Sequence, residues 1–328
     1  MQATGYTARF FGSLLGSVLG AVLYNKDRWG WGLSISHVFA MQAMFPLVLV
    51  LPLAWPLRET ERATRVGSLA ASVKAQSGEV FQALCRRAVY VPMTFVFIYN
   101  VMQIPNAAWR SFLVEGLGFS SYNLGLLSVV GSLFSSVGLV AYKRYFFRTS
   151  WRSIYMCTTA FNVLFSAMQL GLILRLNVAL GIGDLAFALG DDALAEFVNA
   201  IQFLPVCQMY IAFCPDGAEG TTYAILTTLS NVAYAVGSSI GTMLTGVWDV
   251  SNEAIKRGDF GGMWRLSLLT SLVQPLPLLL VGLIPGTREE QRVLQRNDRR
   301  SKWGGGIFLG VLFYSLGLTI YEALAKLV

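Results

Sequence analysis

The sequence predicts an all-α polytopic membrane protein, and three observations support this fold class. Apolar residues make up 55% of the chain and charged residues only 13%, compared with about 25% charged residues in soluble domains. The apolar residues form long stretches, and the charged residues lie almost entirely between those stretches. Because about 20 apolar residues in a helix cross the hydrocarbon core of a bilayer, the pattern predicts about nine spanning helices.

Two of the expected helices precede a long polar connection, residues 57–90, and the others follow it. The last span begins with the glycine run Gly304–Gly306, which would also suit a segment that enters and leaves the membrane on one side. The expected spans are residues 5–24, 34–56, 91–113, 121–142, 153–175, 194–214, 221–247, 263–284 and 304–327.

Basic residues predict which side of the membrane each connection faces. Arg and Lys gather in residues 57–90, 143–152 and 285–303. The alternate connections are short or acidic, and their acidic residues are Glu115, Asp184, Asp191, Asp192 and Glu196. Because cytoplasmic loops carry an excess of Lys and Arg, we place the three basic stretches in the cytoplasm, with Met1 inside and Val328 outside.

The net charge of +7 does not indicate a nucleic-acid partner, because the basic residues lie in short loops rather than on one continuous face. The four cysteines, which lie in or beside the spans without paired spacing, favour packing over disulfide or metal binding. The sequence contains no catalytic triad, metal-ligand cluster or phosphate-binding loop. We therefore expect no catalytic residues, no metal and no cofactor. The expected partners are membrane lipid and a small-molecule substrate.

Two prolines indicate where helices are interrupted. Pro105 lies about midway along the third span, and Pro205 about midway along the sixth. Transporters built from repeated units often break corresponding helices near the midplane of the membrane. Amide side chains lie close to both prolines, which favours a polar cavity at this depth, although simple kinking would also account for the prolines.

The expected substrate-binding residues are Asn106, Arg110, Gln202 and Asn231. A cation within a span is costly unless it is paired or hydrated, and the planar guanidinium of Arg110 suits a carboxylate. Its side chain would also reach the membrane surface by extending along the helix. Asn231 belongs to a polar helix face, for which helix packing is the alternative explanation.

Three spans carry stripes of small residues that let helices approach closely. The first span has Gly12, Gly16 and Gly20, the fourth has Gly131, and the seventh has Gly237 and Gly241. We expect the first and fourth spans to pack against each other through these faces. The stripe on the seventh span then has no complement among the remaining spans.

Several blocks of the sequence resemble the folate–biopterin transporter family. They are Gly181–Phe187, Leu204–Pro205 and Phe213–Thr221, continued by Tyr223–Ala224 and Ser230–Val232 up to Gly237 and Gly241. That family belongs to the major facilitator superfamily, in which two six-helix halves surround a central cavity. The resemblance implies that about four N-terminal helices are missing, so that the chain is a fragment of a longer protein.

The resemblance also implies a division of the chain. Residues 1–56 would be the last two helices of the first half, 57–90 the cytoplasmic linker, and 91–285 the six-helix second half. Residues 286–328 would form a basic loop and one extra helix. The first span would then contact the fourth, and the stripe on the seventh span would face an absent helix.

The implied function is secondary active transport of folates or pterins by alternating access, with possible proton coupling. Arg110 would meet the glutamate carboxylates of folate. Asp216 and Glu219 would act in gating or at a cytoplasmic helix start, where a carboxylate is favoured. The plasma membrane and the plastid envelope are both open as locations. Two alternatives remain: a facilitator of another organic anion, and a non-transporting paralogue that acts as a subunit.

Overall fold

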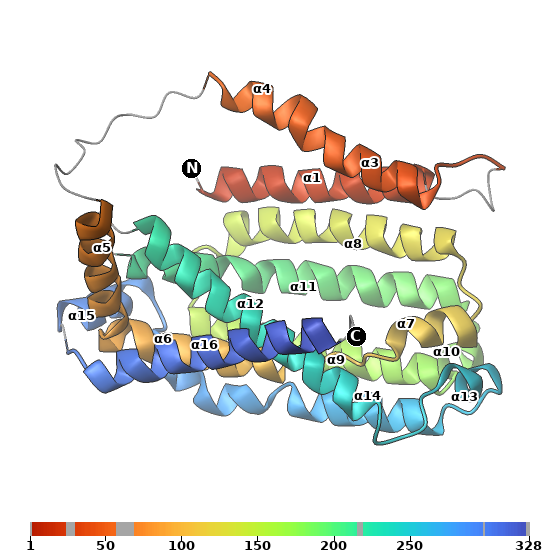
Figure 1. Cartoon of the computed structure of the whole chain (residues 1–328). Coiled ribbons are helices and arrows are strands. Elements are labelled where there is room, and N and C mark those ends of the chain that lie inside the picture. The colour runs from red at the N-terminus through yellow and green to blue at the C-terminus, as the bar shows by residue number, and fades with distance from the viewer. Residues whose placement is uncertain (1, 24–29, 57–68, 215–218, 298, 326–328) are drawn as a thin grey trace.

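The computed structural model describes every residue except 1, 24–29, 57–68, 215–218, 298 and 326–328. Within these described residues every named element is a helix (Figure 1). Six of the helices are long and apolar enough to cross a membrane: Ile35–Ala54, Ser121–Phe146, Trp151–Ile173, Asp184–Phe213, Gly261–Leu283 and Lys302–Ala325. The chain is thus an all-α, multi-pass integral membrane protein, as the sequence predicts.

The other three expected spans correspond to α1 (Gln2–Leu23), α6 (Arg87–Met102) and α12 (Glu219–Leu244). The remaining elements up to residue 146 are α3 (Ile35–Phe45), η1 (Pro46–Val50), α4 (Leu51–Ala54), α5 (Leu69–Leu84), α7 (Trp109–Ser111), η2 (Phe112–Gly116), α8 (Ser121–Ala141) and η3 (Tyr142–Phe146). Those after it are α9 (Trp151–Ile173), α10 (Leu176–Ala179), α11 (Asp184–Phe213), α13 (Asn252–Lys256), α14 (Gly261–Val273), η4 (Leu276–Leu283), α15 (Arg288–Arg296) and α16 (Lys302–Ala325). The number of crossings and the division into halves stay predictions.

The two prolines act differently. Residues 103–106 are not helical, so Pro105 lies in a true break between α6 and α7. The side chain of Asn106 stabilises this break, because its Oδ1 accepts a hydrogen bond from Ala108 N at 3.0 Å. By contrast, α11 continues through Pro205 without interruption. The expected pair of matching interruptions is therefore wrong for the sixth span.

α11 also begins earlier than the sequence indicates. It starts at Asp184 and runs for 30 residues. Two acidic residues expected in a connection, Asp191 and Asp192, therefore lie inside a helix together with Glu196, which the expected span already included. Charge alone made this stretch resemble a loop, but favourable packing against α8 and α9 keeps it helical.

α1, α8 and α11 lie side by side (Figure 1). The contact between α1 and α8 includes Ser17 and Ser132, whose Oγ atoms lie 2.9 Å apart. It does not use the glycine stripe of α1, because an added Cβ at Gly12, Gly16 or Gly20 would meet nothing within 4 Å. α1 and α8 therefore pair as expected, but through a different face of α1.

On α8, Gly131 faces α11 rather than α1. A Cβ added there would lie 3.2 Å from the Oδ2 atom of Asp192 and 3.2 Å from the Cγ atom of Glu196. The small residue thus makes room for acidic side chains of α11.

The stripe on α12 has a partner within the chain, which corrects the expectation that it has none. A Cβ added at Gly237 would lie 2.7 Å from the carbonyl oxygen of Val101, and one at Gly241 would lie 2.6 Å from that of Pro105. These carbonyls belong to the end of α6 and to the break after it. Because the break turns the backbone toward α12, only glycine fits at these positions.

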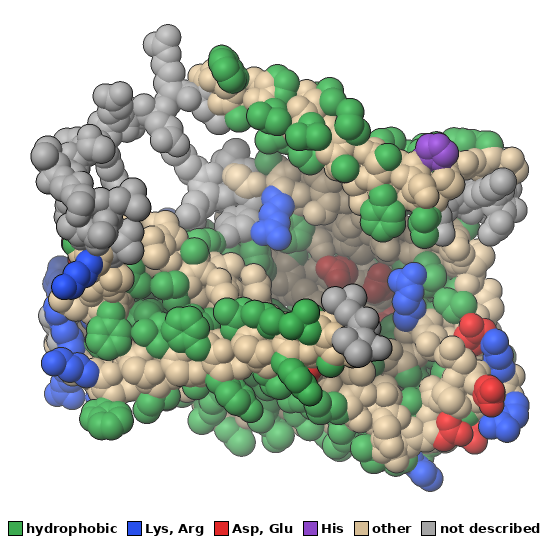
Figure 2. All heavy atoms as spheres, viewed as in Figure 1, with side chains coloured by type: hydrophobic (Ala, Val, Ile, Leu, Met, Phe, Trp, Pro, Cys, Tyr) green, Lys and Arg blue, Asp and Glu red, His purple; other side chains and the backbone are tan. Residues whose placement is uncertain are grey.

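The three basic stretches meet at one end of the molecule, where Lys and Arg side chains gather (Figure 2). Arg87 N donates to Arg299 O, and Trp151 N donates to Gly286 O, both at 2.8 Å. Their shared position agrees with a common cytoplasmic side. Residues 57–68 of the long connection lie outside the described residues.

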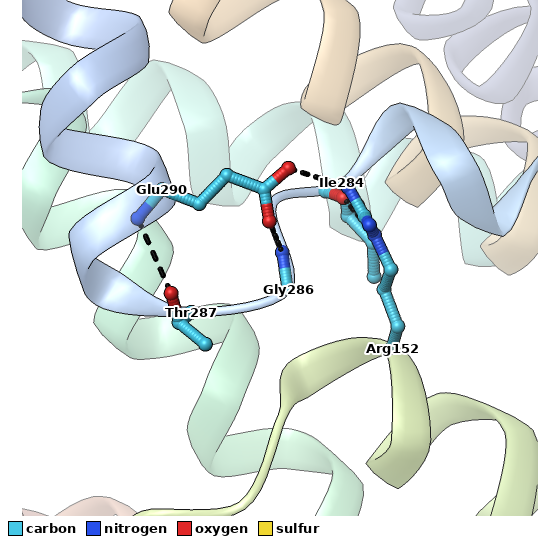
Figure 3. Close-up of polar contacts among 5 residues, drawn as sticks. All are labelled: Arg152, Ile284, Gly286, Thr287 and Glu290. Atoms are coloured by element: carbon cyan, nitrogen blue, oxygen red, sulfur yellow. Dashed lines mark hydrogen bonds and ion pairs between the residues drawn. The ribbon is translucent and has the colours of Figure 1, made fainter.

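One arginine joins two of these stretches (Figure 3). Arg152 donates from Nε to the carbonyl oxygen of Ile284 at 2.8 Å, and its Nη2 lies 2.7 Å from Oε1 of Glu290. The other carboxylate oxygen of Glu290 accepts from Gly286 N at 2.7 Å. Thr287 caps the start of α15 by accepting from Glu290 N at 3.2 Å. We call this set of contacts the Arg152 clamp.

The glycine run near the C-terminus starts a continuous helix. α16 extends from Lys302 to Ala325. An added Cβ at Gly305 would lie 2.5 Å from the Cys85 Sγ atom, so the run lets α16 pack closely against the end of α5.

Candidate functional site

A cavity of about 760 Å³ lies among α1, α6, α9, α11, α12 and α14. Its volume is within the range of about 300–1,000 Å³ that is typical of small-molecule sites. Figure 2 shows this face of the molecule hollowed, with acidic side chains inside the hollow. The break after α6 lies on the lining, because Gln103, Ile104, Pro105 and Asn106 all contribute to it.

Amide side chains from several helices form much of the lining. Asn106 Nδ2 donates to Ser267 Oγ at 2.6 Å, which ties the break to α14. Gln274 Nε2 donates to Gln103 Oε1 at 2.8 Å, and Asn162 Nδ2 donates to Asn199 Oδ1 at 3.2 Å. Further amides on the lining are Asn100, Gln169, Gln202 and Asn231. Such groups both donate and accept hydrogen bonds.

Aromatic side chains form the rest of the surface. The rings of Tyr99 and Tyr155 lie 5.0 Å apart, and the Tyr99 hydroxyl lies 2.9 Å from Thr159 Oγ1. Tyr210 contacts Ser230 through its hydroxyl. The other aromatic members are Phe10, Trp109, Phe165, Phe203, Tyr223 and Tyr234. Flat rings with polar edges suit a flat, polar-edged ligand.

Two charged residues face this cavity among the lining residues that the structure describes. Arg9 on α1 is the cation, and Glu196 on α11 is the carboxylate. Glu196 Oε2 accepts a hydrogen bond from the buried Ser135 on α8 at 2.7 Å. Arg9 was missed in the sequence, although an arginine inside the first apolar stretch is the signal that identifies it. Glu196 was missed because its charge was grouped with the acidic residues of the connection before it, although it lies within the expected span 194–214.

Three of the four predicted substrate-binding residues come together in this cavity. Asn106, Gln202 and Asn231 all line it, although they come from three different parts of the chain. Arg110 does not belong to the lining; it is exposed in α7. Their contact with a substrate stays a prediction.

Of the two predicted gating residues, the structure describes only Glu219. Glu219 is the first residue of α12, whereas Asp216 lies outside the described residues. The neighbouring Cys214 thiol donates to the carbonyl oxygen of Tyr210 at 3.1 Å, which is consistent with packing.

Comparison with known proteins gives a consistent family. A "Folate-biopterin transporter" from Synechocystis sp. is 30% identical over 252 residues, which is 77% of this chain and 49% of that protein. "Probable folate-biopterin transporter 2" from Arabidopsis thaliana is 25% identical over 177 residues, 54% of this chain and 34% of that protein. "Folate transporter 1" from Plasmodium falciparum is 21% identical over 273 residues, 83% of this chain and 52% of that protein.

The chain spans about half the length, or less, of these relatives. No solved structure gives a significant match. The sequence profile of the BT1 family matches residues 1–302, which is most of the chain. The chain therefore belongs to the BT1 family, the family of folate–biopterin transporters.

Proposed function

We propose that the chain is part of a secondary active transporter that carries folates or pterins across a membrane by alternating access. The observation that carries the proposal is the cavity itself, which combines amide edges, aromatic faces and a single described cation in a BT1 family chain. The names of the relatives support a folate-like substrate. The whole activity belongs to the proposal, because the chain covers only about half, or less, of these relatives.

The chemistry of the lining suits both parts of a folate. A pterin ring is flat and carries hydrogen-bond donors and acceptors at its edge. Its faces would pack on the less buried rings of the lining, Trp109 and Tyr234, and its edge would bind the amides of Asn106, Gln202 and Asn231. The glutamate carboxylates would bind Arg9, because a guanidinium donates two parallel hydrogen bonds to a carboxylate. Arg110 has no role in this proposal, since it is exposed outside the cavity.

Proton coupling is the second part of the proposal, and Glu196 is its candidate residue. A carboxylate within a membrane helix is costly when charged and unpaired. Among the described residues, Glu196 forms no ion pair; its contact is with Ser135. Five residues earlier on α11, Asp191 is only 3% exposed, and its Oδ1 has no hydrogen-bond partner within the described structure. If Glu196 bound a proton, the free-energy cost of its unpaired charge within the membrane would be removed. We expect Glu196→Gln to abolish the stimulation of uptake by an inward proton gradient.

The direct test is uptake of labelled substrate by cells that express the protein from its native transcript. Arg9→Ala should weaken the apparent affinity for folate at least about tenfold, because it removes a charged partner of a carboxylate. Biopterin, which has no carboxylate, should be transported nearly unchanged. Arg110→Ala is the matched control, since it also removes one arginine but lies outside the cavity.

Equal losses with Arg9→Ala and Arg110→Ala would contradict the assignment of Arg9. Two results would redirect the proposal itself. Competition by unrelated organic anions, with none by folate or pterins, would indicate a facilitator of another anion. Absence of all uptake, together with co-purification of a full-length relative, would indicate a non-transporting subunit.

A further inference from the structure

A second, smaller cavity lies at the basic end of the molecule, apart from the transport cavity. Its volume is about 260 Å³, and it shares no lining residue with the larger cavity. The lining comprises Arg87, Ala88, Leu294, Asn297 and Arg299. Nothing in the proposed transport cycle uses these residues.

The chemistry of this small cavity suits a phosphate group. Arg87 and Ala88 are the first two residues of α6, and because the Arg87 N–H already donates to Arg299 O, it is the Arg87 side chain that supplies charge here. Arg299 supplies a second guanidinium, and Asn297 supplies an amide donor. The described lining contains no carboxylate that would repel an anion. Two guanidinium groups with an amide donor form a typical phosphate site.

The backbone around the small cavity is held in place before any ligand binds. Arg87 N donates to Arg299 O at 2.8 Å, and Ser301 N donates to Cys85 O at 2.8 Å. α15, which supplies Leu294, is fixed at its start by the Arg152 clamp and near its end by a hydrogen bond from Gln295 to the carbonyl of Ala212. A site that is already ordered loses little entropy when a ligand binds.

Exposed apolar side chains on the lining, and close to it in sequence, indicate a lipid rather than a soluble anion. Val293 is 56% exposed and Leu294 is 38% exposed on α15, and Trp303 at the start of α16 is 84% exposed. Tryptophan is enriched where a membrane meets water. Basic pockets between helices on the cytoplasmic side bind anionic lipid head groups. A free phosphate would leave these apolar side chains in water, whereas a phospholipid would cover them with its chains.

We propose that this cavity binds the phosphate group of an anionic phospholipid. Arg87 and Arg299 hold the phosphate, Asn297 donates a further hydrogen bond, and the acyl chains lie against Val293, Leu294 and Trp303. The site is independent of the transported substrate, so its test does not depend on uptake.

The experiment measures lipid binding to the purified protein in detergent by native mass spectrometry. Phosphatidylglycerol is the anionic probe, phosphatidylcholine the zwitterionic probe, and inorganic phosphate the soluble probe. The unaltered protein should retain phosphatidylglycerol preferentially. Arg87→Gln with Arg299→Gln should weaken that binding roughly thirtyfold, since each arginine contributes about a fivefold step near a charged surface.

Lys143→Gln with Arg148→Gln is the charge-matched control, because both residues are exposed in a basic loop outside the small cavity. This control should keep phosphatidylglycerol binding. An equal loss in both double variants would overturn the proposal in favour of diffuse attraction. Equal retention of phosphatidylcholine, or displacement of phosphatidylglycerol by inorganic phosphate at similar concentration, would also overturn it. Gel-filtration profiles that match the unaltered protein establish that the variants fold.

Discussion

The glycine stripes of α1 and α12 have similar spacing but opposite surroundings. In α1, added Cβ atoms at Gly12, Gly16 and Gly20 would meet no atom within 4 Å among the described residues. In α12, they would lie 2.7 Å and 2.6 Å from backbone carbonyl oxygens at Gly237 and Gly241. A stripe of small residues therefore permits close approach, but the partner's backbone decides whether that approach occurs.

The difference has a structural cause in the partner. The end of α6 breaks at residues 103–106, which directs free carbonyl groups toward α12. α8 is an intact helix where it meets α1, and its own Gly125 and Ser132 make the close contacts, with Ala21 and Ser17 of α1. The glycines of α12 therefore support the break that lines the larger cavity, whereas those of α1 lie on a face that is open among the described residues.

The largest effect is expected for Gly241→Ala, in the tightly packed stripe of α12. Its Cβ would overlap the Pro105 carbonyl, so the break must shift, and overpacking of this kind costs about 1–3 kcal/mol. We expect a lower midpoint of thermal unfolding in detergent and reduced substrate uptake, because Pro105 and Asn106 line the cavity. An unchanged midpoint with unchanged uptake would show that the contact between α12 and the break is not tight.

A second variant tests whether tight glycine contacts matter away from the cavity. Gly305→Ala would place a Cβ 2.5 Å from the Sγ atom of Cys85 and should destabilise the protein by about 1–2 kcal/mol. Substrate affinity should be unchanged. Its control is Gly306→Ala, one residue along, where an added Cβ meets nothing within 4 Å. Similar unfolding midpoints for the two variants would contradict the packing of α16 on α5.

The smallest effect is expected at the open stripe. Gly16→Ala should change stability by no more than about 0.5 kcal/mol, because the added methyl group meets no neighbour and alanine favours helix. The measurement is the midpoint of thermal unfolding in detergent. A clear loss of stability would mean that another helix covers this face of α1. The stripe of α1 would then have a packing partner, as the stripe of α12 does.

Much of the fold follows from composition and spacing. Apolar stretches of sufficient length predict the long helices, and the basic loops predict which ends of those helices lie together. The boundaries of α11 could not be predicted, because Asp191, Asp192 and Glu196 resemble loop residues until neighbouring helices supply Ser135 and the space beside Gly131. Tertiary contacts overrode the local charge signal at this point.

The candidate site could be predicted only in part, again because tertiary contacts decide which residues come together. Asn106, Gln202 and Asn231 lie near prolines or on polar helix faces, and those local signals are visible in the sequence. Arg9 lies on the first helix, far from the other lining residues in sequence. Only the packing of α1 on α8, and of Phe10 near Phe203 with ring centroids 6.0 Å apart, brings it to the cavity. Long-range packing of this kind leaves no local pattern.

The Arg152 clamp has a mechanical consequence for the basic end. Arg152 stands at the start of α9, while the groups that it holds, Ile284 O and Glu290, lie just beyond the end of η4. The start of α9 and the end of η4 are thus held together at one point at the basic end. If α9 tilts, the end of η4 is displaced with it, because Arg152 joins the two segments at this point.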